Sequence, residues 1–107
     1  MNSFDILEIQ SSIGERETSP ALLFDDDDGR IADKTGIKTI HRSDYSAYEL
    51  AIKAANKLNI LPDTRDKIKY LIYVTQSPSF YLPNHASRLQ NELGVSKSTM
   101  CFDINQG

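Results

Sequence analysis

A single cysteine and two histidines are the first residues to consider for nucleophilic or acid–base chemistry in this chain: Cys101, His41 and His85. A cysteine paired with a histidine can form a dyad in which the thiolate attacks a carbonyl carbon. Cys101, however, lies inside the predicted strand at residues 100–104, and a thiol buried in a strand is normally unreactive. The pattern therefore favours a small core residue at Cys101. A lone cysteine also forms no internal disulfide, as is usual in a reducing compartment.

Four consecutive aspartates at residues 25–28, followed by Gly29, invite comparison with a calcium-binding loop. That loop needs acidic residues at positions one, three and five, glycine at six and glutamate at twelve. With Gly29 at position six, Phe24 falls at position one and Thr35 at position twelve, and neither side chain suits the ion. A solvated acidic loop is the favoured interpretation, and no metal site is expected. The glycine-rich phosphate loops of nucleotide-binding proteins are also absent from the sequence.

The 107 residues allow one domain at most. Twelve Lys and Arg against fifteen Asp and Glu give a net charge of −3, so the chain has no basic surplus with which to neutralise nucleic-acid phosphates. Its apolar runs are far shorter than the roughly 20 residues that cross a bilayer, and the first residues do not resemble a secretory signal. We therefore expect neither nucleic acid nor membrane as a partner, and a cytoplasmic location.

Four elements are predicted in the first half of the chain. Residues 4–10 mix apolar and acidic side chains and could form a first strand. Ser19 before Pro20 predicts a short helix, and Arg30–Thr35 predicts another turn that Gly36 would end. A longer helix should begin between Ser43 and Ser46. Its alanine-rich stripe consists of Ala47, Leu50, Ala51, Ala54, Ala55 and Leu58, while Ser46 and Glu49 have capping-box spacing.

The second half predicts a strand, a helix and a second strand. Residues 68–75 form an apolar, β-branched and aromatic run typical of a strand covered on both faces. A helix should begin at Asn84 and end at Gly94, before a strand at residues 100–104. This order predicts two parallel strands joined by a helix. Because such a pair leaves sheet edges and apolar faces uncovered, it suits part of a larger sheet better than a complete unit.

Taken in order, three segments resemble the N-terminal part of the β-ketoacyl-acyl carrier protein synthase III family, a branch of the thiolase-like condensing enzymes. They are Lys-Thr-Gly-Ile at 34–37, Tyr-Val-Thr-Gln-Ser-Pro at 73–78 continuing through Leu82-Pro83 and Leu93-Gly94, and Phe-Asp-Ile-Asn-Gln-Gly at 102–107. The resemblance implies an α/β, thiolase-like fold with a parallel or mixed sheet, present as part of the N-terminal half-domain. Residues 1–107 would be that partial domain, with residues 30–107 matching best.

The resemblance also implies a reaction. In this family a nucleophilic cysteine follows the last strand directly, and the register of residues 102–107 places it immediately after Gly107. The catalytic histidine and asparagine come from a later half, so His41, His85 and Asn105 do not take those roles. The implied partners are acyl-CoA and acyl carrier protein, with a homodimer when the protein is full-length. The implied reaction is a decarboxylative condensation that needs no cofactor, since the CoA thioester is a substrate. The isolated chain should be inactive.

Three positions would contact substrate if the chain follows the family pattern. Leu82 matches a residue that crosses the dimer interface and limits the size of the acyl group, although a loop leucine packed on the core is an equal alternative. Lys34 matches a basic residue near the CoA phosphates, or is a solvated lysine. Arg30 stands where many relatives place an aromatic residue against the adenine, on which a guanidinium could stack. The acidic run at residues 25–28 would repel the CoA phosphates.

Two alternatives remain open at the level of sequence. The chain could belong to another thiolase-like condensing enzyme, such as a hydroxymethylglutaryl-CoA synthase or a specialised-metabolite synthase. It could instead be a small non-catalytic α/β interaction module. Both condensing-enzyme hypotheses predict cysteine after Gly107, whereas the interaction module predicts a natural terminus there.

Overall fold

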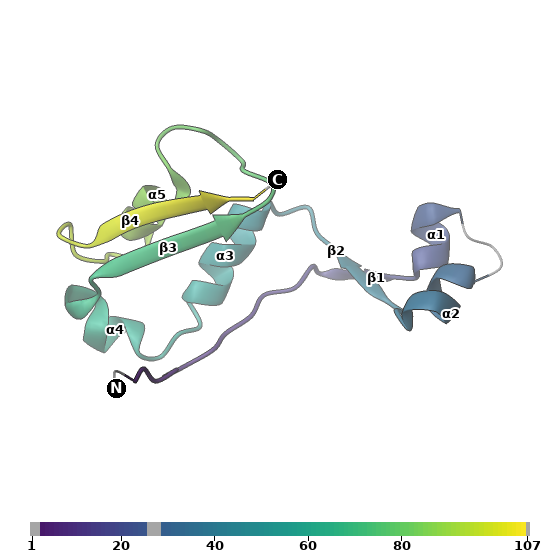
Figure 1. Ribbon diagram of the computed structural model, residues 1–107, viewed down its shortest axis with the longest axis horizontal. Coiled ribbons are helices and arrows are strands. Elements are labelled where there is room, and N and C mark those ends of the chain that lie inside the picture. Colours follow the sequence, from purple (N-terminus) through teal and green to yellow (C-terminus); the bar gives the residue numbers. More distant parts are fainter. Residues whose placement is uncertain (1–2, 26–28, 107) are drawn as a thin grey trace. The chain divides into compact units, whose positions relative to one another are not determined.

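The computed structural model describes residues 3–25 and 29–106, which form two compact units. Residues 13–45 make one unit, and residues 1–12 with 46–107 make the other. Figure 1 labels their helices and strands along the chain. Within the described ranges, no helix has the length and apolar character of a membrane span.

The smaller unit is built from two short strands and two short helices. Strands β1 (Arg16–Thr18) and β2 (Ile40–Arg42) pair antiparallel, and between them lie α1 (Pro20–Phe24) and α2 (Arg30–Thr35). Both helices lie where the sequence predicts them: Pro20 is the first residue of α1, and Gly36 ends α2 with a φ of 73°. The sequence did not predict the two strands, because three-residue strands with mostly exposed side chains carry little hydrophobic pattern.

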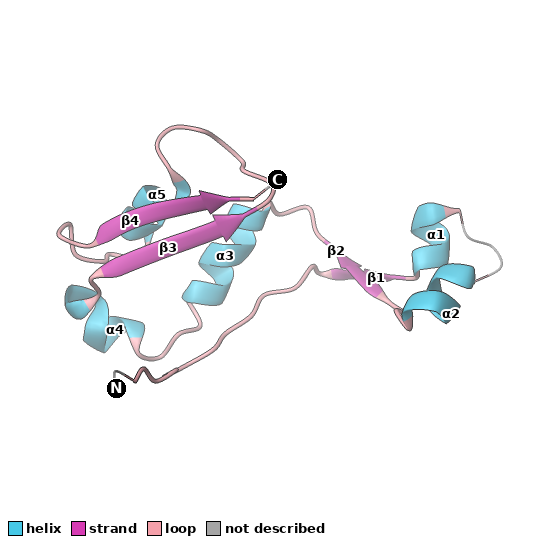
Figure 2. Cartoon of the chain, viewed as in Figure 1, coloured by secondary structure: helices cyan, strands magenta, loops and turns pink. Residues whose placement is uncertain are grey.

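The larger unit is organised around a parallel pair of strands, β3 (Tyr70–Thr75) and β4 (Met100–Asn105). Tyr70 pairs with Met100, and the register continues without a bulge to Thr75 and Asn105. Two helices pack on one face of this pair: α3 (Ala47–Ala55) and α5 (His85–Glu92). Figure 2 shows both helices behind the two strands. The predicted strand–helix–strand order and the parallel pairing are confirmed.

The core lies between the helices and the strands. Its buried members are Tyr48 on α3, Tyr73 on β3, and Ala86 and Leu89 on α5. The capping box predicted for α3 is present, since Ser46 Oγ accepts from the Glu49 N–H at 3.2 Å and the Glu49 carboxylate accepts from the Ser46 N–H at 2.7 Å. The helix ends at Ala55 rather than extending to Leu58.

The opposite face of the sheet is open, so the prediction that β3 is covered on both faces is wrong for this chain. Six apolar side chains on that face are exposed: Tyr70, Ile72, Val74, Met100, Phe102 and Ile104. The sheet that the described residues form here has two strands and helices on one side only. An apolar run indicates that a strand can be buried on both faces, but the covering elements must come from elsewhere.

Two further segments of the larger unit differ from the sequence-based expectation. Residues 3–12 form neither helix nor strand, so the strand predicted at residues 4–10 is wrong: the segment finds no partner strand, and a strand needs one. It is held instead by Glu8, whose carboxylate accepts from the N–H groups of Asn59 and Ile60. A short helix α4 (Leu61–Thr64) and a 3-10 turn η1 (Arg65–Lys67) precede β3, which therefore begins at Tyr70 rather than Ile68.

Candidate functional site at the carboxyl ends of the strands

The carboxyl ends of β3 and β4 lie side by side, because the two strands are parallel and in register. The N–H of Gln106 donates to the carbonyl oxygen of Thr75 at 3.1 Å, which extends the pairing past the last strand residue. Thr75 Oγ1 accepts from the N–H of Ser77 at 3.1 Å and turns the chain into the loop that follows. In open parallel sheets, this edge is where loops place binding and catalytic groups.

His85 and Asp103 form the most buried polar group at this edge. His85, the first residue of α5, is 1% exposed, and its Nδ1 lies 2.7 Å from Oδ2 of Asp103 on β4. Asp103 also accepts from the backbone N–H of His85 at 2.7 Å and of Ala86 at 2.8 Å. The carboxylate thus satisfies N–H groups at the start of α5, which have no partners inside the helix. It joins the helix to the sheet.

The charge state of Asp103 follows from these contacts. Desolvation at this partly buried position raises the pKa of Asp103, but the hydrogen bonds from the N–H groups of Ala86 and His85 and from the His85 side chain lower it by a larger amount. The net result is a pKa below the ordinary aspartate value of 3.8, so Asp103 is a carboxylate at neutral pH. No local sequence pattern predicts this pair, because residues 18 positions apart meet only through the tertiary fold.

Aromatic rings enclose the His85 imidazole on both faces. The ring of Phe80 stacks at 4.2 Å between centroids, and that of Tyr73 stacks at 4.7 Å. Tyr48 packs against the same histidine at 5.7 Å, and the Arg88 guanidinium lies over the Phe80 ring at 4.4 Å. The imidazole is thereby shielded from water, which leaves it unsuited to exchange a proton with a substrate in this arrangement.

Leu82 lies in the loop between β3 and α5, next to the cis peptide bond that it forms with Pro83. Its side chain is 89% exposed and that of its neighbour Tyr81 is 87% exposed. The alternative in which Leu82 anchors the loop on the core is therefore wrong. An apolar side chain held out from the surface at the functional edge is available to another surface or a ligand.

Arg30 and Lys34 lie together in the smaller unit. They are one turn apart on α2 and line a hollow of about 290 Å³ with Phe24, Asp25 and Ile31. The hollow offers cationic groups beside an exposed aromatic ring, a combination that suits a phosphate and a heterocycle. Asp25 brings a negative charge to the same hollow. The other predicted acidic positions, residues 26–28, lie outside the described residues. Phe24 was not singled out from the sequence.

The other residues considered for chemistry from the sequence, Cys101 and His41, make contacts within the fold. Cys101 Sγ donates to the Thr99 carbonyl oxygen at 3.6 Å, and burial raises the pKa of its thiol, as expected for an unreactive core cysteine. His41 Nδ1 lies 3.1 Å from the carbonyl oxygen of Gly14 in the smaller unit. Among residues 3–25 and 29–106, no three His, Cys, Asp or Glu side chains gather in a way that could hold a metal ion.

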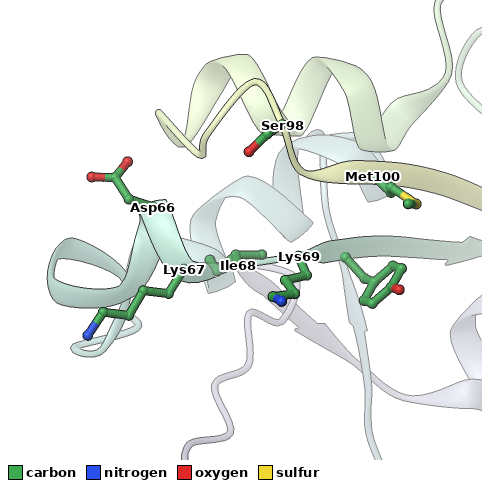
Figure 3. A pocket seen from close by; sticks show the side chains of 7 residues that line it. Asp66, Lys67, Ile68, Lys69, Ser98 and Met100 are labelled. Carbon is green, nitrogen blue, oxygen red and sulfur yellow. The ribbon is translucent and has the colours of Figure 1, made fainter.

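A second hollow, of about 560 Å³, opens at the amino-terminal end of the parallel strands. Figure 3 shows Lys69, just before β3, and Met100, the first residue of β4, beside it, with Asp66 and Lys67 directed away toward solvent. Its polar groups do not converge, and it lies at the end of the strands opposite the usual position of active sites. The carboxyl edge is therefore the better candidate.

Known proteins resemble this chain in both sequence and fold. No protein-family model matches it. A β-ketoacyl-[acyl-carrier-protein] synthase III of Clostridium acetobutylicum is 32% identical over 98% of this chain and 34% of its own length. A solved 3-oxoacyl-(acyl-carrier-protein) synthase III has 30% identity and a TM-score of 0.77, covering 95% of this chain and 32% of its own. The synthase III of Thermus thermophilus has 25% identity and a TM-score of 0.76, covering 95% and 33%.

The chain thus spans about one third of the length of the proteins that it matches. The match includes both units, since it covers nearly all of the chain. In sequence and in its partial thiolase-like fold, this chain is similar to the N-terminal third of β-ketoacyl-[acyl-carrier-protein] synthase III proteins.

Proposed function

We propose that this chain is the N-terminal part, residues 1–107, of an acyltransferase that condenses an acyl-CoA starter with a malonyl group on acyl carrier protein. The observation that carries the proposal is the match in both sequence and fold, over nearly the whole chain, to synthases of this type. The whole protein would be a homodimer that acts in the cytoplasm and requires no cofactor. The isolated chain would be inactive, since the catalytic residues lie outside it.

The proposed nucleophile is a cysteine directly after Gly107. It would follow β4 at the edge where β3 and β4 end together. A thiol at the start of a helix has a lowered pKa, because the partial positive charge there stabilises the thiolate. The thiolate attacks the acyl-CoA carbonyl, the acyl–sulfur bond forms and CoA leaves as a thiol. This first half-reaction needs a place for the CoA and a place for the acyl group.

The second half-reaction joins two carbon atoms. The malonyl thioester loses carbon dioxide, and the electron pair left behind attacks the carbonyl of the acyl-enzyme. The bond to sulfur breaks and a β-ketoacyl thioester leaves on the carrier protein. A histidine and an asparagine from the later part of the protein would stabilise the charge on the malonyl carbonyl, and backbone amides would hold the oxyanion.

The place for CoA would be the hollow on α2. Lys34 would hold a phosphate as a point charge, and Arg30 would stack on the adenine beside Phe24. The position of both cations in one hollow supports this assignment. The carboxylate of Asp25 in the same hollow would repel the CoA phosphates. We therefore expect CoA to bind more weakly than it would in a hollow without this charge.

The place for the acyl group would include Leu82. The 89% exposure of its side chain supports a role in the pocket of a dimer partner, since the leucine is not used in the core of its own chain. Its bulk would limit the length or branching of the starter. A larger residue would narrow the range of accepted acyl groups, and a smaller one would widen it.

The test is acyl transfer by the complete polypeptide that contains this chain. Incubation with a panel of acyl-CoA thioesters, followed by mass spectrometry of the peptide that spans Gly107, should show an acyl group on the residue that follows. Addition of malonyl-acyl carrier protein should then release the label as a β-ketoacyl product. Acetylation of that residue, followed by addition of the enzyme-bound acetyl carbanion to the ketone of acetoacetyl-CoA and hydrolysis from the enzyme, would instead indicate the hydroxymethylglutaryl-type alternative. A residue other than cysteine after Gly107, or no acylation, would overturn the proposal.

A further inference from the structure

The hydrogen bonds of His85 define which of its nitrogen atoms carries the proton. The N–H of Ser79 lies 3.1 Å from His85 Nε2, and a backbone N–H can only donate. Nε2 must therefore present its lone pair as an acceptor. The proton of the neutral ring is then on Nδ1, where it donates to Asp103 Oδ2 at 2.7 Å. His85 therefore connects two parts of the structure: its Nδ1 is bonded to Asp103 on β4, and its Nε2 is bonded to Ser79 in the loop that precedes α5.

That loop, residues 76–83, carries Leu82. It is fixed near its start by the Ser77 N–H bond to Thr75 Oγ1 and in its middle by the Ser79 bond to His85. Phe80 adds the ring that stacks on the imidazole. Leu82 follows two residues later with its side chain exposed. The path of the loop up to Leu82 thus depends on an acceptor that His85 supplies.

We infer that His85 is a positioning residue for acyl-group selection: its Nε2 holds Ser79, and through this bond sets the position of the loop that presents Leu82. This inference rests on the proposed function, because it assigns to Leu82 the role of contacting the acyl group. It adds a residue that touches no substrate and that acts through the loop. Asp103 supports the effect by holding the imidazole in the tautomer that leaves Nε2 free to accept.

Two substitutions at His85 test the hydrogen bonds of its two ring nitrogen atoms separately. The amide nitrogen of His85→Asn takes the place of Nδ1 and can still donate to Asp103, but it leaves Ser79 without an acceptor. The amide of His85→Gln reaches the place of Nε2 and can offer its oxygen to the Ser79 N–H. Both variants lose the ring between Phe80 and Tyr73, so each is the control for the other's loss of stacking. His41→Asn, at the chain's other histidine, controls for removal of an imidazole elsewhere.

Two readouts on the complete protein are required. Hydrogen exchange of the Ser79 amide should accelerate about fivefold to tenfold in His85→Asn, the effect of losing one hydrogen bond, and less in His85→Gln. The ratio of kcat/KM for short against long or branched acyl-CoA should change about tenfold in His85→Asn and return toward the original in His85→Gln. His41→Asn should alter neither quantity.

The outcomes distinguish the inference from the function on which it rests. Acyl transfer with equal selectivity in His85→Asn and His85→Gln would overturn the inference and leave the proposed function intact, since a merely structural role affects both variants alike. Unchanged Ser79 exchange in His85→Asn would also overturn it. An original protein that transfers no acyl group overturns the proposed function, and the acyl-selection role of His85 with it.

Discussion

The carboxylate of Asp103 accepts three hydrogen bonds from two consecutive residues, His85 and Ala86, at 2.7–2.8 Å. One carboxylate on β4 thereby satisfies the first N–H groups of α5 and orients the buried His85 imidazole. Since its side chain is 11% exposed, the interaction is shielded from solvent. The link between sheet and helix at the candidate site depends on this residue.

Replacement of Asp103 should therefore destabilise the protein. Asp103→Asn removes the charge and turns one acceptor into a donor that faces an N–H, and we expect a loss of about 2–3 kcal/mol in the free energy of unfolding. Urea denaturation measures the loss. The pKa of Asp103 is lower in the folded state than its ordinary value of 3.8. Its contribution to the free energy of unfolding is therefore complete above pH 3.8 and is lost as the pH falls through the folded-state pKa. In Asp103→Asn, this pH-dependent part of the free energy of unfolding should be absent. If the free energy of unfolding depended on acidic pH in the variant as it does in the original protein, the role given to Asp103 would be wrong.

A second prediction concerns the exposed loop. Leu82→Ala and Leu82→Phe should leave the free energy of unfolding within about 0.5 kcal/mol of the original, because the side chain makes few contacts in its own chain. They should shift acyl-CoA selectivity in opposite directions, toward larger groups for alanine and smaller groups for phenylalanine. Tyr81→Ala, at an equally exposed neighbouring position, is the matched control and should leave selectivity unchanged. Equal shifts for all three variants would argue against a specific role of Leu82.

A third prediction concerns the hollow on α2. Lys34→Gln should raise the KM for acyl-CoA about twofold to fivefold, as an exposed ion pair is worth little in water, and salt should reduce the difference. Asp25→Asn should lower the KM, because it removes a charge that repels phosphate. Lys38→Gln, outside the hollow, is the control. Neither hollow variant should change the KM for an acyl-pantetheine thioester, which lacks the nucleotide. A similar change with that shorter substrate would place the phosphates elsewhere.

Local sequence signals predicted the parts of the fold that depend on neighbouring residues. Gly36 marks the end of α2, because its φ of 73° suits glycine. Ser46 and Glu49 mark the start of α3 through their reciprocal bonds. The parallel order of β3 and β4 followed from the helix between them. Each of these features is encoded within a few residues or by the order of elements.

The remaining features depend on contacts between distant residues. The predicted α3 stripe included Ala47, which is exposed, and omitted Tyr48, which is in the core beside Phe80 and His85. The buried pair of His85 and Asp103 has no local pattern at all. The exposure of Leu82 could not be predicted either, since a leucine beside proline occurs equally in cores and on loop tips. Tertiary packing decides all three positions.

The last prediction concerns Glu15 in the smaller unit. Its carboxylate accepts from Ser43 Oγ at 2.6 Å and from the Asp44 N–H at 2.9 Å, and these bonds lower its pKa from 4.5 to about 2. Because the folded-state pKa is depressed, the stabilisation is complete above pH 4.5 and is lost as pH falls toward 2. An NMR titration of the Glu15 carboxyl carbon should give a midpoint near 2. Ser43→Ala should move that midpoint upward, since the hydroxyl bond is the largest cause of the shift. A midpoint near 4.5 in the original protein would show that these bonds do not hold in solution.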